Sequence, residues 1–430
     1  RKESSAASDV YKRQGHNLPK ILKKYNLDES IYAKVGNKRI KSQLCFTSDT
    51  LFKYVNKSVK NTYDSDHAFN KYMILPNDNN IVCTCNTCKA VGNSNKDAAP
   101  AVFTFLNKLA KQNKKASFFT TAYVSVKDVP RFKAESNTGV FYSTIDIQKG
   151  IPLENTKDYT KFEAAIKKWK KYVNNVYIWD YTVNYDNYFD IFPILKVTQQ
   201  NLKLYKNLGI NGVFLHGSEY DYSTFQDLKA IVFAKLLWNP DVDVDKEIEK
   251  YFDNKYSNKL ASVLTNYYSF VDNAFYTSKR KLGIYSGINK TVRKYLDPKV
   301  FFEFYNEFDT HTQTNKFDKD YLKIATALTF LKLEIMRDYG FGVYGYGTLN
   351  KNQEVIVKNE AATLLDNLTT YSKSANLKTY NERAYKIEDY IKSWRKAIYK
   401  FHKRKNYFYK KPFEILSEMD EDYTDKKVLN

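Results

Sequence analysis

The stretch NVYIWDY, residues 175–181, decides the expected fold. It is a short, continuous run of aromatic and β-branched residues, which is typical of a strand buried on both faces of a parallel sheet. Five further runs share this character. They are SQLCFTS (42–48), KYMILPN (71–77), ASFFTTAYV (116–124), GVFYSTID (139–146) and NGVFLHG (211–217). The six runs together predict a parallel sheet.

Amphipathic segments separate several of these runs, and four of them predict helices: 98–112, 161–173, 199–209 and 224–239. Strand, helix and strand repeated in this way form parallel βα units. No glycine-rich phosphate loop follows any run, which argues against a dinucleotide-binding sheet. Polar residues follow nearly every run instead, as they do in a (β/α)8 TIM barrel. We therefore expect an α/β protein built on such a barrel.

The chain of 430 residues is expected to have three parts. Residues 1–14 look like translated read-through of a sequencing adaptor, so we expect a non-native tail there. Residues 15–240 carry the strand and helix patterns of a partial barrel, and residues 241–430 carry mainly helical patterns. No run of about 18 apolar residues occurs, so we expect no transmembrane segment.

The net charge of +21 would suit a polyanionic partner. The lysines are dispersed, however, and arginine is scarce, whereas nucleic-acid-binding proteins cluster their positive charge and use arginine for bidentate contacts. We attribute the charge to a general compositional bias and expect no nucleic-acid partner. We expect an oligo- or polysaccharide as the partner, and the excess of lysine is compatible with an acidic one.

Several motifs, in this order along the chain, resemble the bacterial family DUF4838. They are YAKVGNKR (32–39), PNDNNIVCTCNTC (76–88), WDY (179–181), GVFLHGSE (212–219) and LLWNP (236–240). The family resembles alpha-glucuronidases and beta-N-acetylhexosaminidases, which are (β/α)8 glycoside hydrolases, and occurs on exported proteins of polysaccharide-using bacteria. The resemblance implies that the six runs are strands three to eight of an incomplete barrel. It also implies a periplasmic, cell-surface or secreted protein that acts on a glycan.

Cleavage of a glycosidic bond generally needs two carboxylates, one as the acid and one as the base or nucleophile. Three acids follow predicted strands: Asp78, Asp180 and Glu219, with Asp146 as a weaker fourth. The resemblance implies Asp78 as the general acid, because the acid of the related barrels follows strand four, and it leaves Asp180 and Glu219 as base or nucleophile. A turn role for Asp78 and a solvated surface role for Glu219 remain alternatives. A carbohydrate-binding barrel without catalysis is the alternative function.

Sugar rings bind against aromatic faces, with polar groups around the hydroxyls. The residues that could supply these contacts at predicted strand ends are Tyr123, Trp179, Tyr181 and His216, with Tyr185 and Tyr220 as further aromatic candidates. The resemblance implies that His16 lies just past strand two and could contribute as well. The 37 tyrosines of the chain make chance placement of a ring near a strand end common. A single histidine at a strand end is commonly a structural residue, so a structural role for His16 and His216 remains an alternative.

The four cysteines, Cys45, Cys83, Cys85 and Cys88, form a separate candidate site. Four thiolates can hold a structural Zn²⁺, although CxCxxC matches the usual pair of CxxC motifs only in part. Disulfides are the alternative for an exported protein, and a catalytic thiol ranks third. We expect a structural staple beside the loop that carries Asp78. No cofactor is expected for catalysis.

Overall fold

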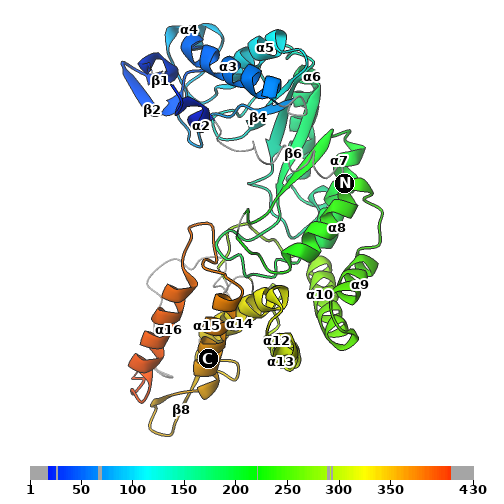
Figure 1. Cartoon of the computed structure of the whole chain (residues 1–430), viewed down its shortest axis with the longest axis vertical. Coiled ribbons are helices and arrows are strands. Elements are labelled where there is room, and N and C mark those ends of the chain that lie inside the picture. The colour runs from blue at the N-terminus through cyan, green and yellow to red at the C-terminus, as the bar shows by residue number, and fades with distance from the viewer. Residues whose placement is uncertain are drawn as a thin grey trace. The chain divides into compact units, whose positions relative to one another are not determined.

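The computed structural model describes residues 18–25, 28–65, 70–219, 221–287, 291 and 294–407 (Figure 1). The chain divides into two compact units built from interleaved segments. Unit 1 contains the described residues up to Asp146 together with Thr156–Asp180 and Leu204–Leu215. Unit 2 contains Ile147–Asn155, Tyr181–Lys203 and the described residues from His216 onward. The boundary expected at residue 240 stays a prediction.

The central feature is a five-stranded sheet in which sequence order equals spatial order, β3-β4-β5-β6-β7. Its strands are β3 (Lys71–Met73), β4 (Ser117–Ala122), β5 (Thr138–Ser143), β6 (Asn175–Tyr181) and β7 (Gly212–His216). The first three pairings are parallel, with Met73 opposite Phe119 and Tyr142 opposite Ile178. Parallel neighbours in consecutive order are what successive βα units of a barrel produce. The α/β prediction is therefore confirmed, and five of the six runs lie in this sheet.

The run 42–48 does not join the sheet, contrary to its prediction as barrel strand three. Its first residues end β2 (Lys38–Leu44), which pairs antiparallel with β1 (Tyr32–Val35) in a separate hairpin. The two-residue loop Gly36–Asn37 explains the difference, because Gly36 adopts φ +58° and such loops favour tight hairpins. β2 is also mostly exposed, which a strand inside a parallel sheet would not be.

Helices of unit 1 cover one face of the sheet (Figure 1). They include α3 (Asp49–Ser65), α5 (Ala99–Gln112) and α6 (Tyr159–Tyr172). The short helix α4 (Asn86–Ala90) lies between β3 and α5 in the chain, and α2 (Leu18–Leu22) and a 3-10 turn (Glu29–Ile31) precede β1. Phe162 of α6 meets Tyr142 of β5 edge to face, at 5.6 Å between ring centroids. The other face carries a hydrophobic cluster of Met73, Leu75, Phe119, Phe141, Tyr177, Trp179 and Phe214.

Unit 2 is mainly helical, as the patterns beyond residue 241 predict. Its helices are α8 (Gln226–Trp238), α9 (Val244–Lys255), α10 (Asn258–Ser278), α12 (Pro298–Asp309), α13 (Thr312–Asn315), α14 (Lys319–Tyr339), α15 (Asn359–Ser374) and α16 (Ile387–Phe401), with hairpin strands β8 (Gly347–Leu349) and β9 (Val355–Val357). The helix α7 (Leu195–Asn207) begins in unit 2. α14 is the core helix, because every residue from Tyr321 to Met336 except Lys323 is buried. Of the helices that the structure describes, none combines the length and the apolar composition needed to cross a bilayer.

Candidate functional site

A group of tyrosines lies at the end of β6 and just beyond it, in unit 2. Tyr181 is the last residue of β6, Tyr185 and Tyr188 lie on the loop that leads to α7, and successive ring centroids are 6.0 and 6.1 Å apart. Asn184 fixes this loop, since its side chain donates to Asp190 at 2.9 Å and to the Ser286 carbonyl at 2.7 Å. The loop is therefore held by buried hydrogen bonds and presents its rings in a defined arrangement.

His216, the last residue of β7, lies against two of these rings. Its imidazole is 5.7 Å from the Tyr181 ring and 5.5 Å from the Tyr185 ring. The Thr182 amide and the Tyr185 hydroxyl donate to the His216 carbonyl at 2.9 and 3.2 Å. Burial lowers the pKa of His216, and the charges of Glu219 and Glu382 oppose that shift. The imidazole is accordingly neutral at neutral pH, with one donor and one acceptor nitrogen.

Glu219 lies beside this histidine, and the charge of Glu382 also acts on it. Glu219 Oε1 is 3.5 Å from His216 Nε2, and its side chain is 61% exposed. Glu219 also adopts φ +56°, a strained conformation for a residue with a side chain that is common at functional sites. Glu382 accepts a hydrogen bond from the Tyr285 hydroxyl at 3.0 Å, and its amide donates to the Tyr185 carbonyl at 3.0 Å. Burial and then the charges of Glu382, Asp221 and Glu219 raise the pKa of Tyr188, so both glutamates act on the same ring.

A buried cation completes the group. Lys149 is only 4% exposed, and its Nζ lies 5.5 Å from the centre of the Tyr181 ring. Its backbone amide donates to the Leu282 carbonyl at 2.7 Å. We call the combined set the tyrosine–glutamate cluster, and its members are Lys149, Tyr181, Tyr185, Tyr188, His216, Glu219, Tyr285 and Glu382. It brings together rings, two carboxylates, an imidazole and an ammonium group within unit 2.

Of the residues expected from the sequence, Tyr181, Tyr185, His216 and Glu219 meet in this cluster. Trp179 belongs instead to the hydrophobic cluster of unit 1, 4.8 Å from the Phe214 ring. Tyr123 follows β4 in unit 1 and forms a β-bridge with Val126. His16 and Tyr220 lie outside the described residues. The substrate-binding roles of all these residues stay predictions.

Asp78 lies exposed in a loop that is tied to the end of β2. Asn77 and Asn79 donate to the Ser42 carbonyl at 2.9 and 2.8 Å, and Gln43 donates to the Asn77 carbonyl at 3.0 Å. These hydrogen bonds from side-chain amides hold PNDNN as a turn, and the Asp78 carboxylate lies in solvent. Asp146 is likewise exposed after β5. The role of Asp78 as general acid stays a prediction.

Asp180 is buried, at 4% exposure, on the helix-covered face of the sheet. Its Oδ1 accepts from the Thr144 hydroxyl at 2.7 Å, and its Oδ2 accepts from the Tyr205 hydroxyl of α7 at 3.2 Å. Burial and the neighbouring Asp180 charge raise the pKa of Tyr205 well above its usual value. The catalytic role of Asp180 stays a prediction, while these bonds join β5, β6 and α7.

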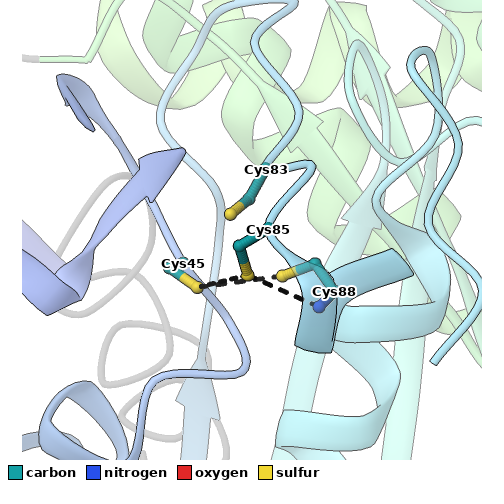
Figure 2. Close-up of side chains that lie close together, drawn as sticks. All are labelled: Cys45, Cys83, Cys85 and Cys88. Carbon is teal, nitrogen blue, oxygen red and sulfur yellow. Dashed lines mark hydrogen bonds between the residues drawn. The ribbon is translucent and has the colours of Figure 1, made fainter. Parts of the chain in front are cut away.

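The four cysteines come together in unit 1 (Figure 2). Cys45 follows β2, Cys83 and Cys85 lie in the segment after β3, and Cys88 lies in α4. Their Sγ atoms all lie within 4.8 Å of one another, and all four are free cysteines. Hydrogen bonding among the thiols holds the pKa of Cys45 below its usual value and raises that of Cys83 to about 11.

Sequence reasoning missed Lys149, Tyr188, Tyr285 and Glu382. Tyr285 and Glu382 lie in the region expected to be only a helical appendage, and each is brought to the cluster by long-range contacts. Tyr285 and Glu382 are 97 residues apart in the chain. Nothing in the local pattern of NERAY (381–385) distinguishes Glu382 from other surface acids. The NYDNY pattern around Tyr188 could have marked that loop as a rigid, aromatic turn.

Comparisons with known proteins place the chain in a wider context. The family model described as "Domain of unknown function (DUF4838)" matches residues 5–269. No curated protein matches the chain. A solved structure titled as a GH138 enzyme targeting pectin rhamnogalacturonan II is similar at 10% sequence identity and a TM-score of 0.34. The alignment covers 83% of this chain and 57% of that one, so the chain spans little more than half the length of that enzyme.

Proposed function

Because the chain belongs to the DUF4838 family, we propose that it is a glycoside-hydrolase-like protein that acts on a complex, acidic oligo- or polysaccharide outside the cytoplasm. The observation that carries the proposal is the tyrosine–glutamate cluster of unit 2. It combines an exposed aromatic ring, Tyr285, with two exposed carboxylates, Glu219 and Glu382, and glycosidic cleavage generally uses two carboxylates.

Several groups of the cluster can each contact a particular part of a sugar. The half-exposed ring of Tyr285 suits the C–H face of a pyranose ring, and the buried rings of Tyr185 and Tyr181 pack behind it. Neutral His216 can donate to or accept from a hydroxyl group. The excess of lysine in the chain is compatible with an acidic glycan.

Glu219 and Glu382 are the carboxylates that we propose for the chemistry. One protonates the glycosidic oxygen as it leaves, and the other activates water or attacks the anomeric carbon. The charges of both glutamates act on His216 and on Tyr188, which supports the pair. Asp78 is the general acid that the sequence favours, so it enters the test as a competing candidate.

The test is hydrolysis of aryl glycosides and uronate-bearing oligosaccharides by the full chain and by three variants, Glu219→Gln, Glu382→Gln and Asp78→Asn. Loss of a general acid or base typically costs about 10²–10⁴-fold in rate. We expect such a loss in kcat for Glu219→Gln and Glu382→Gln, with binding of the best substrate retained. Glu249→Gln, at an exposed position of α9, is the matched control and should keep full activity.

The outcomes separate the alternatives. A loss of activity confined to Asp78→Asn would identify Asp78 as the general acid and would contradict the proposed roles of Glu219 and Glu382. Binding of oligosaccharides without turnover by the unaltered chain would identify a carbohydrate-binding protein of this fold. Neither binding nor turnover across acidic and neutral glycans would overturn the proposal.

A further inference from the structure

The cysteine cluster of unit 1 brings together four thiols from two separate parts of the chain. Cys45 comes from the segment after β2, and Cys85 lies 40 residues later, in the segment between β3 and α5. Three of the four side chains, Cys45, Cys83 and Cys88, are buried. The sulfurs point toward a common centre in Figure 2. All four cysteines of the chain lie together, which indicates that the thiolates bind a common ligand.

The spacing of the sulfurs identifies the ligand. A Zn²⁺ ion binds thiolate sulfur at about 2.3 Å, and a regular tetrahedron of that size has S–S edges of about 3.8 Å. Cys45 Sγ lies 3.7 Å from Cys88 Sγ and 3.8 Å from Cys85 Sγ. A disulfide would require two sulfurs at about 2.05 Å. We propose that Cys45, Cys83, Cys85 and Cys88 bind one Zn²⁺ as a tetrahedral tetrathiolate site.

The surroundings suit the charge of such a site, which is −2 for Zn²⁺ with four thiolates. The Lys34 amide donates to Cys83 Sγ at 3.1 Å, and the Cys88 amide donates to Cys85 Sγ at 3.5 Å. The Thr47 hydroxyl lies 3.1 Å from Cys88 Sγ and can donate as well. Hydrogen bonds to the ligands of a metal fix their orientation and disperse their charge.

The site has a structural role, because protein sulfur occupies all four positions and none is left for water or substrate. The zinc links the β1–β2 hairpin, through Cys45, to the segment that begins with the Asp78 loop. That loop is already bonded to Ser42 and Gln43 at the end of β2. The β1–β2 hairpin does not pair with the five-stranded sheet. The metal therefore gives this hairpin a second attachment, in addition to the hydrogen bonds from the Asp78 loop.

The test begins with the full chain, purified under reducing conditions without chelators. Elemental analysis should give one zinc per chain, and X-ray absorption should give a first shell of four sulfurs at about 2.3 Å. Replacement by Co²⁺ should produce the intense visible absorption of a tetrahedral tetrathiolate. Cys88→Ser should lose most of the bound metal. Thr47→Val, which alters the same cluster but keeps every thiolate, should retain one zinc per chain.

Three results would overturn the proposal. They are four titratable thiols with no bound metal, a mass lower by the hydrogens lost in disulfide formation, or a metal shell that contains nitrogen or oxygen. Metal analysis of the unaltered chain decides the question even if Cys88→Ser fails to fold. Activity is not part of the readout, so failure here is distinct from failure of the glycoside-hydrolase proposal.

Discussion

A buried carboxylate in unit 2 provides a quantitative test of how the tyrosine-bearing loop is held. Asp272 of α10 is fully buried and accepts the backbone N–H groups of Leu195 and Lys196 at 2.9 and 3.3 Å. These are the first residues of α7, where the N–H groups have no partner inside the helix. Asp272 thus fixes the point at which the loop 181–194 enters its helix.

Burial raises the pKa of Asp272 from 3.8 to about 6. The difference of about two units corresponds to roughly 3 kcal/mol, at about 1.4 kcal/mol per unit. Because the folded-state pKa is the higher one, the protonated form is favoured by folding. Its contribution to the free energy of unfolding is fully present below about pH 4 and is lost as the pH rises through 6.

The perturbation is Asp272→Asn, which mimics the neutral carboxyl at every pH and keeps one acceptor oxygen. The free energy of unfolding of the variant minus that of the parent should rise by roughly 2–2.5 kcal/mol between pH 4 and pH 7, which is most of the full difference. Urea unfolding followed by tryptophan fluorescence measures both proteins across this range, and the subtraction cancels the titration of all other groups.

Asp253→Asn, at an exposed position of α9, is the matched control and should give a difference that changes little with pH. A difference for Asp272→Asn that is equally flat would refute the reasoning. It would mean that the two amide hydrogen bonds fully offset the cost of burying the charge.

Two further predictions concern other contacts of the site and the sheet. Gly150→Ala places a Cβ atom 2.0 Å from the Arg280 carbonyl oxygen, so it should lower the free energy of unfolding by about 1–3 kcal/mol or more. Gly283→Ala, whose Cβ would lie 3.6 Å from its nearest neighbour, should be almost neutral in the same chemical denaturation. Tyr205→Phe removes a donor from buried Asp180 and should cost about 1.5–3 kcal/mol. Unchanged stability, equal to that of the exposed-site control Tyr399→Phe, would show that Asp180 needs no such partner.

The sequence predicts the elements of this protein better than it predicts their contacts. Continuous apolar runs locate five strands of the parallel sheet, because a strand buried on both faces leaves a strong local pattern. The hairpin β1–β2 was missed since the apolar end of β2 outweighed the Gly36–Asn37 turn signal. The four cysteines were correctly grouped, because thiols are scarce in the chain and each carries its own chemistry. Glu382 could not be predicted, since its position depends on the folding of the helical region.

The alternation of β6 explains why the site departs from the strand end that the sequence favoured. Successive side chains of a strand point to opposite faces, so Trp179 and Asp180 cannot both face one ligand. Trp179 enters the hydrophobic cluster, and Asp180 turns to Thr144 and Tyr205. A buried carboxylate that accepts two hydroxyl donors is a good structural anchor but a poor contact for a solvent-borne glycan. Carboxylates for chemistry on a large substrate must be both accessible and fixed, and Glu219 and Glu382 meet both conditions through His216 and Tyr285.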